Sequence, residues 1–376
     1  MGIDTLRESI ISHMDCVAGT ESRDKGGLLH EHLEGMILQG SGLTLFVSDG
    51  GSGLLESISE VSHRAGRAAD LFVLNLSRHS ETQGSTFNPF TIGGADQVQK
   101  LLETQLPGPL QNDRWGVFKD RATALVGAVA PALVWLRDHK GVALNIEVIR
   151  FSIELRWIWK LAIEKVALLR DPATETVRGL DVNGEIPEDI TALLRSYLSE
   201  LPGYDPTLPL DQQKGDEPSK QHGYAQFYFT ATFTQLAVSL GHIFRVETGD
   251  IDMRDVVLNR RILVVILPAL AYADDTVASL CKLVAQSITN VCEESLGEAV
   301  GADAATVSHP GWDPARFWIG FQELSPRVTS AFSLTAARGG NFNIGVFATF
   351  ADRAGLWVNS EPERDRRPTN GDGAEN

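Results

Sequence analysis

Short apolar runs near the start of the chain alternate with a helical pattern. The runs at 42–48 and 70–76 have the length and flanks of buried β-strands. Between them, apolar residues recur at helical spacing in residues 53–68, and a glycine near the end of this segment is a helix stop signal. The order strand, helix, strand is therefore predicted. Three more strand-like runs follow at 260–270, 316–321 and 342–350. Together these segments predict an α/β core around a mostly parallel sheet.

The pattern becomes helical in the middle of the chain, where apolar residues recur every three or four positions with little strand signal. Helices are predicted at 95–106, 114–140, 145–170 and 188–201. A stretch rich in Pro, Gly and charge at 202–222 predicts a loop, and a helix is predicted at 224–241. After it, Thr-Gly-Asp between two apolar-rich arms at 242–257 predicts a β-hairpin.

These patterns divide the chain into five segments. They are a first part of the sheet domain (1–94), an inserted all-helical domain (95–201), a loop (202–222), a second part of the sheet domain (223–358) and a tail (359–376). The tail has no large apolar residue up to its end, which is typical of disorder.

Composition and charge narrow the class of protein. The 376 residues are 43% hydrophobic and 22% charged, which suits a globular protein with a large core. The 33 basic and 49 acidic residues give a net charge of -16, which disfavours DNA as a partner because nucleic-acid affinity depends on Lys and Arg. Three cysteines form no disulfide framework, so a reducing cytoplasm is expected. The uncharged stretch at 122–136 is too short to span a membrane and predicts a buried helix, and we expect neither a signal peptide nor an anchor.

Several stretches resemble a known family. They are "FNPF" (87–90), "LPGYDP" (201–206), "QHGYAQFYFTATF" (221–233) and "GHIFRVETGDIDMRDVVLNRRILVVILPAL" (241–270). They are similar to the type IV secretion coupling proteins, most of all to the DotL/IcmO branch beside the TraD/TraG group. The resemblance implies a RecA-like, FtsK/HerA-type P-loop NTPase fold with a central mostly parallel sheet and an inserted all-alpha domain. It also implies a ring at the inner membrane that recruits substrates for a secretion channel.

The resemblance places a nucleotide-binding loop at "VAGTESRDKGG", residues 17–27. A P-loop reads GxxxxGK[ST], in which Lys binds the outer phosphates and the hydroxyl holds Mg²⁺. Gly19 and Lys25 keep this pattern, with Thr20 beside the first glycine, but Gly26 replaces the hydroxyl residue. Asp24 replaces the second glycine and sets a carboxylate near phosphate. Two interpretations stay open: residual nucleotide binding through Lys25 and the following helix N-terminus, or a surface turn that binds nothing.

The remaining family positions are altered too. Gln322 stands where the family has an Asp that positions magnesium, although Glu323, the family's water-polarising residue, remains. Phe350 replaces a glutamine sensor, and Gly51 replaces a lysine. Arg338 is either an arginine finger toward a neighbouring subunit or a surface arginine. Changes at four places, namely the nucleotide-binding loop, Gln322, Phe350 and Gly51, within a preserved hydrophobic framework predict a pseudo-ATPase.

Three functions are therefore considered. The leading hypothesis is a coupling-protein-like scaffold that recruits substrates or adaptors, alone or in a homo- or hetero-oligomeric ring, and reaches the inner membrane only through partners or a missing N-terminal segment. It needs no cofactor. The alternative is a divergent ATP-hydrolysing motor with ATP and magnesium, which must use Lys25, Glu323 and Arg338. A nucleic-acid-binding protein comes third because of the acidic charge.

Other constellations favour structural interpretations. The His-Glu-His run at 30–32 predicts a solvated helix face rather than a metal site. Cys281 and Cys292 predict small core residues on one helix. The aromatic run at 227–233 predicts core packing in preference to base stacking. The basic and aromatic residues at 150–160, with Trp157 and Trp159 among them, predict either a protein-docking face or an amphipathic cover for the core.

Overall fold

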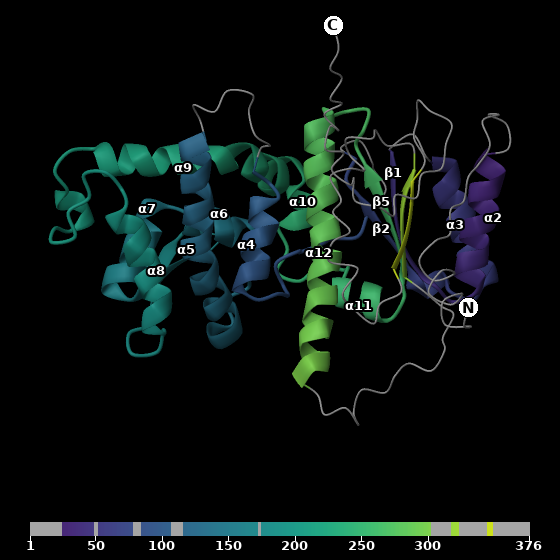
Figure 1. The fold of residues 1–376 in the computed structure, drawn as a ribbon, viewed down its shortest axis with the longest axis horizontal. Helices are drawn as coiled ribbons and strands as arrows, with labels where there is room; N and C mark the ends of the chain where they lie inside the picture. Colours follow the sequence, from purple (N-terminus) through teal and green to yellow (C-terminus); the bar gives the residue numbers. More distant parts are fainter. Residues whose placement is uncertain are drawn as a thin grey trace, which may run out of the picture.

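The computed structural model of the protein describes residues 25–48, 52–77, 84–106, 116–171, 174–301, 317–322 and 344–348. Figure 1 shows two parts side by side: a sheet with flanking helices, and a mostly helical part on the other side of the long helix α12 (Asp274–Gly301). The predicted α/β class with a central parallel sheet is confirmed. This architecture is consistent with the RecA-like fold that the resemblance implied.

The central sheet has five parallel strands in the order β2-β5-β1-β6-β7. Their bounds are β1 (Gly42–Ser48), β2 (Leu71–Asn75), β5 (Ile262–Leu267), β6 (Phe317–Gln322) and β7 (Ile344–Ala348). Residues 42–47 of β1 are all buried, because this strand lies between two others and helices cover both faces. A strand buried on both faces has apolar residues at successive positions, as β1 does. The five strands coincide with the five predicted runs, so these predictions are confirmed.

Helices cover both faces of the sheet. They are α2 (Lys25–Leu38), α3 (Ser52–Arg64), α11 (Met253–Leu258) and α12. Successive strand residues point to opposite faces. Leu43, Leu45 and Val47 therefore pack against α2 and α3, whereas Phe46 joins the larger core that includes α11 and α12. That larger core continues from the sheet through α12 into the helical part, so one apolar interior joins both parts.

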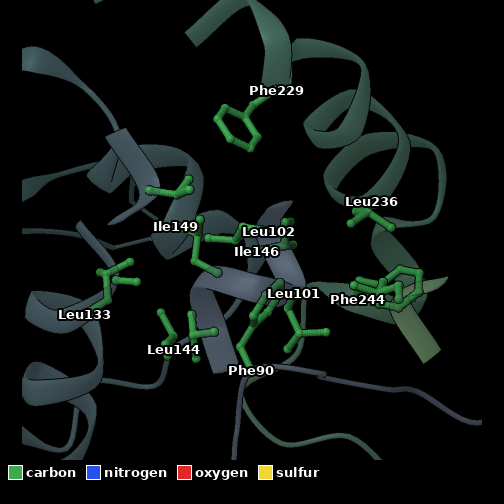
Figure 2. Close-up of a cluster of buried hydrophobic side chains, with 14 of the residues drawn as sticks. Phe90, Leu101, Leu102, Leu133, Leu144, Ile146, Ile149, Phe229, Leu236 and Phe244 are labelled. Atoms are coloured by element: carbon green, nitrogen blue, oxygen red, sulfur yellow. The ribbon is translucent and has the colours of Figure 1, made fainter. Parts of the chain in front are cut away.

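The helical part contains α4 (Ala95–Glu103), α5 (Gly116–Lys140), α6 (Ile146–Ser152), α7 (Leu155–Trp159), a π-helix (Lys160–Glu164), α8 (Glu188–Ser199), α9 (Glu217–Phe233), a second π-helix (Thr234–Ser239) and α10 (Gly241–Phe244). Figure 2 shows its centre, where side chains such as Leu101, Leu133, Ile149, Phe229 and Phe244 converge from five of these helices. The stretch at 122–136 lies in α5, as predicted. Within the described ranges, no helix combines the length and apolarity that a membrane crossing requires.

The expectation of a purely helical insert is wrong at one place. Residues of the helix predicted at 145–170 instead form β3 (Val166–Arg170), which pairs antiparallel with β4 (Val177–Asp181). Lys165 has a φ of 57° and ends the preceding π-helix in a left-handed conformation. The indole Nε1 of Trp157 then donates to the Leu168 carbonyl at 2.9 Å, which holds the hairpin against α7.

Two further predictions in the return segment are wrong. The loop predicted at 202–222 ends early, because α9 begins at Glu217 with Pro218 in its first turn, where no N–H is needed. The hairpin predicted at 242–257 is replaced by α10 and α11. The Asp252 side chain accepts from the Arg254 backbone N–H at 2.9 Å and so begins α11.

One arginine ties together three elements of the sheet part. Arg67 donates through Nη1 to the carbonyls of Ile37 (3.1 Å) and Ser41 (2.8 Å), and through Nη2 to that of Arg260. Its Nε lies 3.0 Å from the Asp70 carboxylate. The end of α2 and the residues before β1 and β5 are thereby fixed by a single half-buried cation.

Candidate functional site

The carboxyl ends of β1 and β6 lie next to each other at one edge of the sheet. β1 ends at Ser48 and β6 at Gln322, and Val47 is paired in register with Gln322. From β1 the chain continues to β2 on one side, whereas β6 and β7 lie on the other side of β1. Open α/β sheets bind ligands where the strand order diverges in this way. This edge is therefore the candidate nucleotide site.

The first residues of α2 reach the same edge. Only residues 39–41 separate α2 from β1, so the helix and the strand run in opposite directions. The 14 residues of α2 span about 21 Å and the seven residues of β1 about 23 Å. Lys25 therefore lies at the level of Ser48. A helix N-terminus at this position offers free N–H groups and a favourable dipole to an anion.

Three of the predicted site residues belong to the elements that border this edge. Lys25 and Gly26 are the first two residues of α2, and Gln322 is the last residue of β6. The other candidates lie outside the described residues: Gly19, Thr20, Asp24, Gly51, Glu323, Arg338 and Phe350.

Whether a magnesium-bound nucleotide fits at this edge depends on the oxygen ligands that its residues provide. On the alignment that the resemblance implies, Gly26 has no hydroxyl and Gln322 has an amide where a carboxylate is expected. Magnesium prefers charged oxygen ligands. Across the described ranges, no group of three or more His, Cys, Asp or Glu side chains is arranged to hold a metal ion. On that alignment, the described positions do not fit a magnesium-bound nucleotide.

Two stretches that connect the sheet part with the helical part are locked to each other; we call residues 86–90 and 246–251 the clasp. Asn88 is 2% exposed, and its Nδ2 donates to the carbonyls of Leu144 (2.9 Å), Val246 (3.1 Å) and Glu247 (2.8 Å). Its Oδ1 accepts from the backbone N–H of Phe90 at 3.1 Å. A single buried amide therefore joins both connecting stretches to the helical part.

A second set of contacts closes the clasp. The Asp250 carboxylate accepts from the backbone N–H (2.8 Å) and the hydroxyl (2.7 Å) of Thr86, and these bonds lower the pKa of Asp250. Ile251 forms a parallel bridge with Phe87. At Gly249 a Cβ atom would lie 2.8 Å from the Phe87 Cα, so only glycine permits this approach.

The clasp is formed by the stretches that carried the family resemblance, "FNPF" and "RVETGDI". In the sequence these stretches are a family signature, and the pattern of the second predicted a local hairpin. Asn88 binds the carbonyls of Val246 and Glu247 in the first arm, and Thr86 binds Asp250 in the second. Both arms therefore find their partners more than a hundred residues earlier in the chain. The Asn in the first stretch and the Gly-Asp in the second were the signals available in the sequence.

Comparison with known proteins identifies the family. No family model matches the chain. The Type 4 coupling protein DotL of Legionella pneumophila is 31% identical to it over 278 residues, which are 71% of this chain and 34% of DotL. The chain belongs to the type IV coupling proteins. It spans about a third of the length of this curated relative.

Solved structures of the conjugative coupling protein TrwB are also similar to this coupling protein. The unbound form of TrwBΔN70 has a TM-score of 0.40 and 13% identity, and the likeness covers 84% of this chain and 62% of that one. TrwB in complex with GDPNP, a non-hydrolysable GTP analogue, has a TM-score of 0.39 and 13% identity over 83% and 63% of the two chains. At these values the likeness does not establish a shared site.

His30, Cys281 and Cys292 lie where structural contacts account for them. His30 hydrogen-bonds to Ser57, and its Nε2 lies 3.9 Å from the Glu34 carboxylate on the same helix. Cys281 and Cys292 are buried on α12, and burial raises their thiol pKa values to about 12 and about 11. The prediction of small core residues is confirmed for this pair.

A histidine that the sequence did not single out lies inside the helical part. His222 is buried, and its Nε2 lies 2.9 Å from the Ile153 carbonyl. A carbonyl can only accept, so Nε2 carries the proton and Nδ1 accepts from the Tyr197 hydroxyl at 2.8 Å. Burial lowers the pKa of His222 to about 4, so the ring is neutral.

The aromatic predictions are confirmed only in part. Phe229 and Phe233 are buried, as expected for core packing, but Phe227 is 74% exposed, so the prediction is wrong at that position. Trp157 lies in the core of the helical part rather than on a docking face. Trp159 is half-buried beneath Lys160, whose Nζ lies 5.7 Å from the ring centroid.

Proposed function

We propose that the chain acts in type IV secretion or conjugative transfer as a coupling protein that recruits substrates or adaptors, with ATP hydrolysis weak or lost. The observation that supports this is the presence of Gly26 near the start of α2 and of Gln322 at the end of β6, the two elements that border the edge where a nucleotide would bind. The helix start and the strand end are present there, but Gly26 has no side-chain oxygen and Gln322 has a neutral amide oxygen in place of the carboxylate that magnesium prefers. Phosphoryl transfer depends on metal ions to neutralise the developing charge, so the loss of these ligands removes a main catalytic contribution.

In this role the sheet part serves as a scaffold and the helical part offers surface to partner proteins. The partners would be secretion components, transferred substrates or adaptors, met at the inner membrane. The net charge of -16 disfavours DNA as the cargo. The clasp would hold the helical part in a constant position while partners bind.

The test is a nucleotide assay on three matched proteins. The wild type, Lys25→Ala and the control Lys214→Ala are compared for magnesium-dependent ATP hydrolysis and for ATP binding by calorimetry. We expect the three rates to be equal. The double variant Gly26→Ser with Gln322→Asp restores both oxygen ligands, and we expect it to gain magnesium-dependent nucleotide affinity.

A magnesium-dependent rate in the wild type that Lys25→Ala abolishes and Lys214→Ala preserves would contradict the proposal. That outcome would favour the divergent motor, in which Lys25, Glu323 and Arg338 carry the reaction.

A further inference from the structure

The hairpin of β3 and β4, which the sequence did not predict, has an open edge. β3 and β4 form a sheet of two strands, and among the described residues no third strand pairs with β4. Four of the five residues of β4 are exposed, and Val177 is 50% exposed. The strand contains no proline and its register has no bulge, two features that often block a strand edge. An unblocked edge is a template for another extended segment.

The register shows which backbone groups of β4 face outward. Val182, which follows β4, donates its N–H to the Lys165 carbonyl at 2.9 Å. Hydrogen-bonded pairs occur at every second residue of an antiparallel ladder, so the backbone groups of Val177, Gly179 and Asp181 point away from β3. None of these three residues has a backbone hydrogen bond to another described residue. Three N–H groups and three carbonyls are thus free to pair with an incoming strand.

The centre of this edge carries an exposed cation. Arg178 forms no ion pair with a carboxylate in the part of the chain that the structure describes. The chain has 49 acidic and 33 basic residues, so carboxylates are available to most of its cations. Asp181 is the last residue of β4, and Glu175 in the turn before β4 is paired with Arg170 at 3.2 Å. Arg178 is therefore the charge that an incoming strand meets at the middle of β4.

Gly179 leaves a gap in the face of the hairpin that carries Val177. The two residues share this face because successive strand residues point to opposite faces. A Cβ atom at Gly179 would lie 2.8 Å from Cγ1 of Val166, so a larger residue would displace that valine. An aromatic ring on a neighbouring strand covers such a glycine well, and here it would also pack against the exposed Val177.

We propose that the open edge of β4 binds an extended segment of a partner protein as a third, antiparallel strand, with an acidic residue opposite Arg178 and an aromatic residue opposite Gly179. Antiparallel pairing is the more stable arrangement and continues that of the hairpin. Side chains directly opposite each other lie about 4.5 to 5.5 Å apart at Cβ, which suits an ion pair at Arg178. A nucleic acid is disfavoured as the occupant, because it has no backbone N–H groups for the free carbonyls of β4.

The geometry also gives the order of residues in the partner. In an antiparallel strand the residue before the acid lies opposite Gly179 and the residue after it lies opposite Val177, so the order is aromatic, acidic, apolar. Binding at this edge rests on the recruiting role proposed for the helical part, but it needs no nucleotide. A failure of the peptide test therefore leaves the outcome of the nucleotide assay unchanged, and the reverse also holds.

Fluorescence anisotropy with labelled peptides tests the binding. The first peptide has Phe-Glu-Val at its centre and threonines on either side, and a dissociation constant on the order of 100 μM is expected. A second peptide has Phe-Lys-Val, and a third has N-methylvaline in place of the valine, which removes an N–H that pairs with β4. Both should bind at least about fivefold more weakly, because one loses the ion pair with Arg178 and the other a backbone hydrogen bond.

The charge can be reversed on both sides of the pair. Arg178→Glu should weaken binding of the Glu peptide at least about fivefold and strengthen that of the Lys peptide by a similar factor. Lys214→Glu, at an exposed residue of the loop before α9, changes the net charge equally and should bind both peptides like the wild type. Circular dichroism checks that both variants are folded.

Residue-resolved amide exchange by NMR gives a second measurement, on the wild type. The Glu peptide should slow exchange at Val177, Gly179 and Asp181 and leave Arg178 and Leu180 unchanged, because the last two already pair with β3. A wild type without saturable binding up to about 1 mM peptide overturns the strand pairing. So does equal binding of the three peptides, an Arg178→Glu protein that keeps the preference for the Glu peptide, or slowed exchange confined to other elements.

Discussion

Replacing Asn88 with alanine removes the buried amide at the centre of the clasp. Its Nδ2 contacts three carbonyl oxygens and its Oδ1 one N–H group, all between 2.8 and 3.1 Å. Each neutral hydrogen bond contributes about 1 kcal/mol net, and the buried carbonyls left behind add their desolvation, so a loss of about 3 to 4 kcal/mol in unfolding free energy is expected. Asn88→Asp should lose at least as much, because its carboxylate would face three carbonyl oxygens.

The assay is urea unfolding followed by tryptophan fluorescence, combined with hydrogen exchange of peptides covering the clasp. Exchange should increase in residues 86–90 and 246–251 in both Asn88 variants. Asn259→Ala is the matched control, because the Asn259 side chain makes one exposed hydrogen bond to Asp255 and should change stability by less than about 0.5 kcal/mol. An Asn88→Asp protein as stable as the wild type, with unchanged exchange at the clasp, would refute this account.

Three further predictions concern stability. Arg67→Ala should lower the unfolding free energy by about 3 kcal/mol in urea titrations, because it removes charged hydrogen bonds to three backbone carbonyls. Arg64→Ala, at a side chain 52% exposed, should change it by less than about 0.5 kcal/mol, and equal losses would argue against the role of Arg67. The folded pKa of His222, about 4, lies below its ordinary value of 6.5, so the unfolded chain binds the proton first as the pH falls. The contribution of His222 to the unfolding free energy is constant above pH 6.5, and about 3 kcal/mol of it is lost between pH 6.5 and 4. His222→Gln should make the unfolding free energy depend less on pH in this range. An unchanged pH dependence would assign the loss to other groups. Phe229→Ala should lose about 4 kcal/mol by thermal or urea unfolding, whereas Phe227→Ala should lose less than about 0.5 kcal/mol; similar losses would contradict their different burial.

Local patterns were sufficient for the sheet. The run at 42–48 predicted β1 because a strand covered on both faces has apolar side chains at consecutive positions, and that feature is visible without any partner. The same holds for the run that became β5. The residue types at the candidate site, Gly26 and Gln322, can also be read from the sequence alone. So can the absence of a hydroxyl at the first position and of a carboxylate at the second.

Tertiary structure decided the features that depend on distant partners. Asn88 binds the carbonyl of Glu247, and Asp250 binds Thr86, so the expected hairpin was wrong because each arm had a better partner elsewhere. Phe227 and Phe229 are close in sequence and equal in hydrophobicity, yet only Phe229 faces the core. Hydrophobicity shows that a helix has an apolar side, but which side is buried is set by the elements that pack against it. That choice is made by contacts between residues far apart in the chain, and no local pattern contains them.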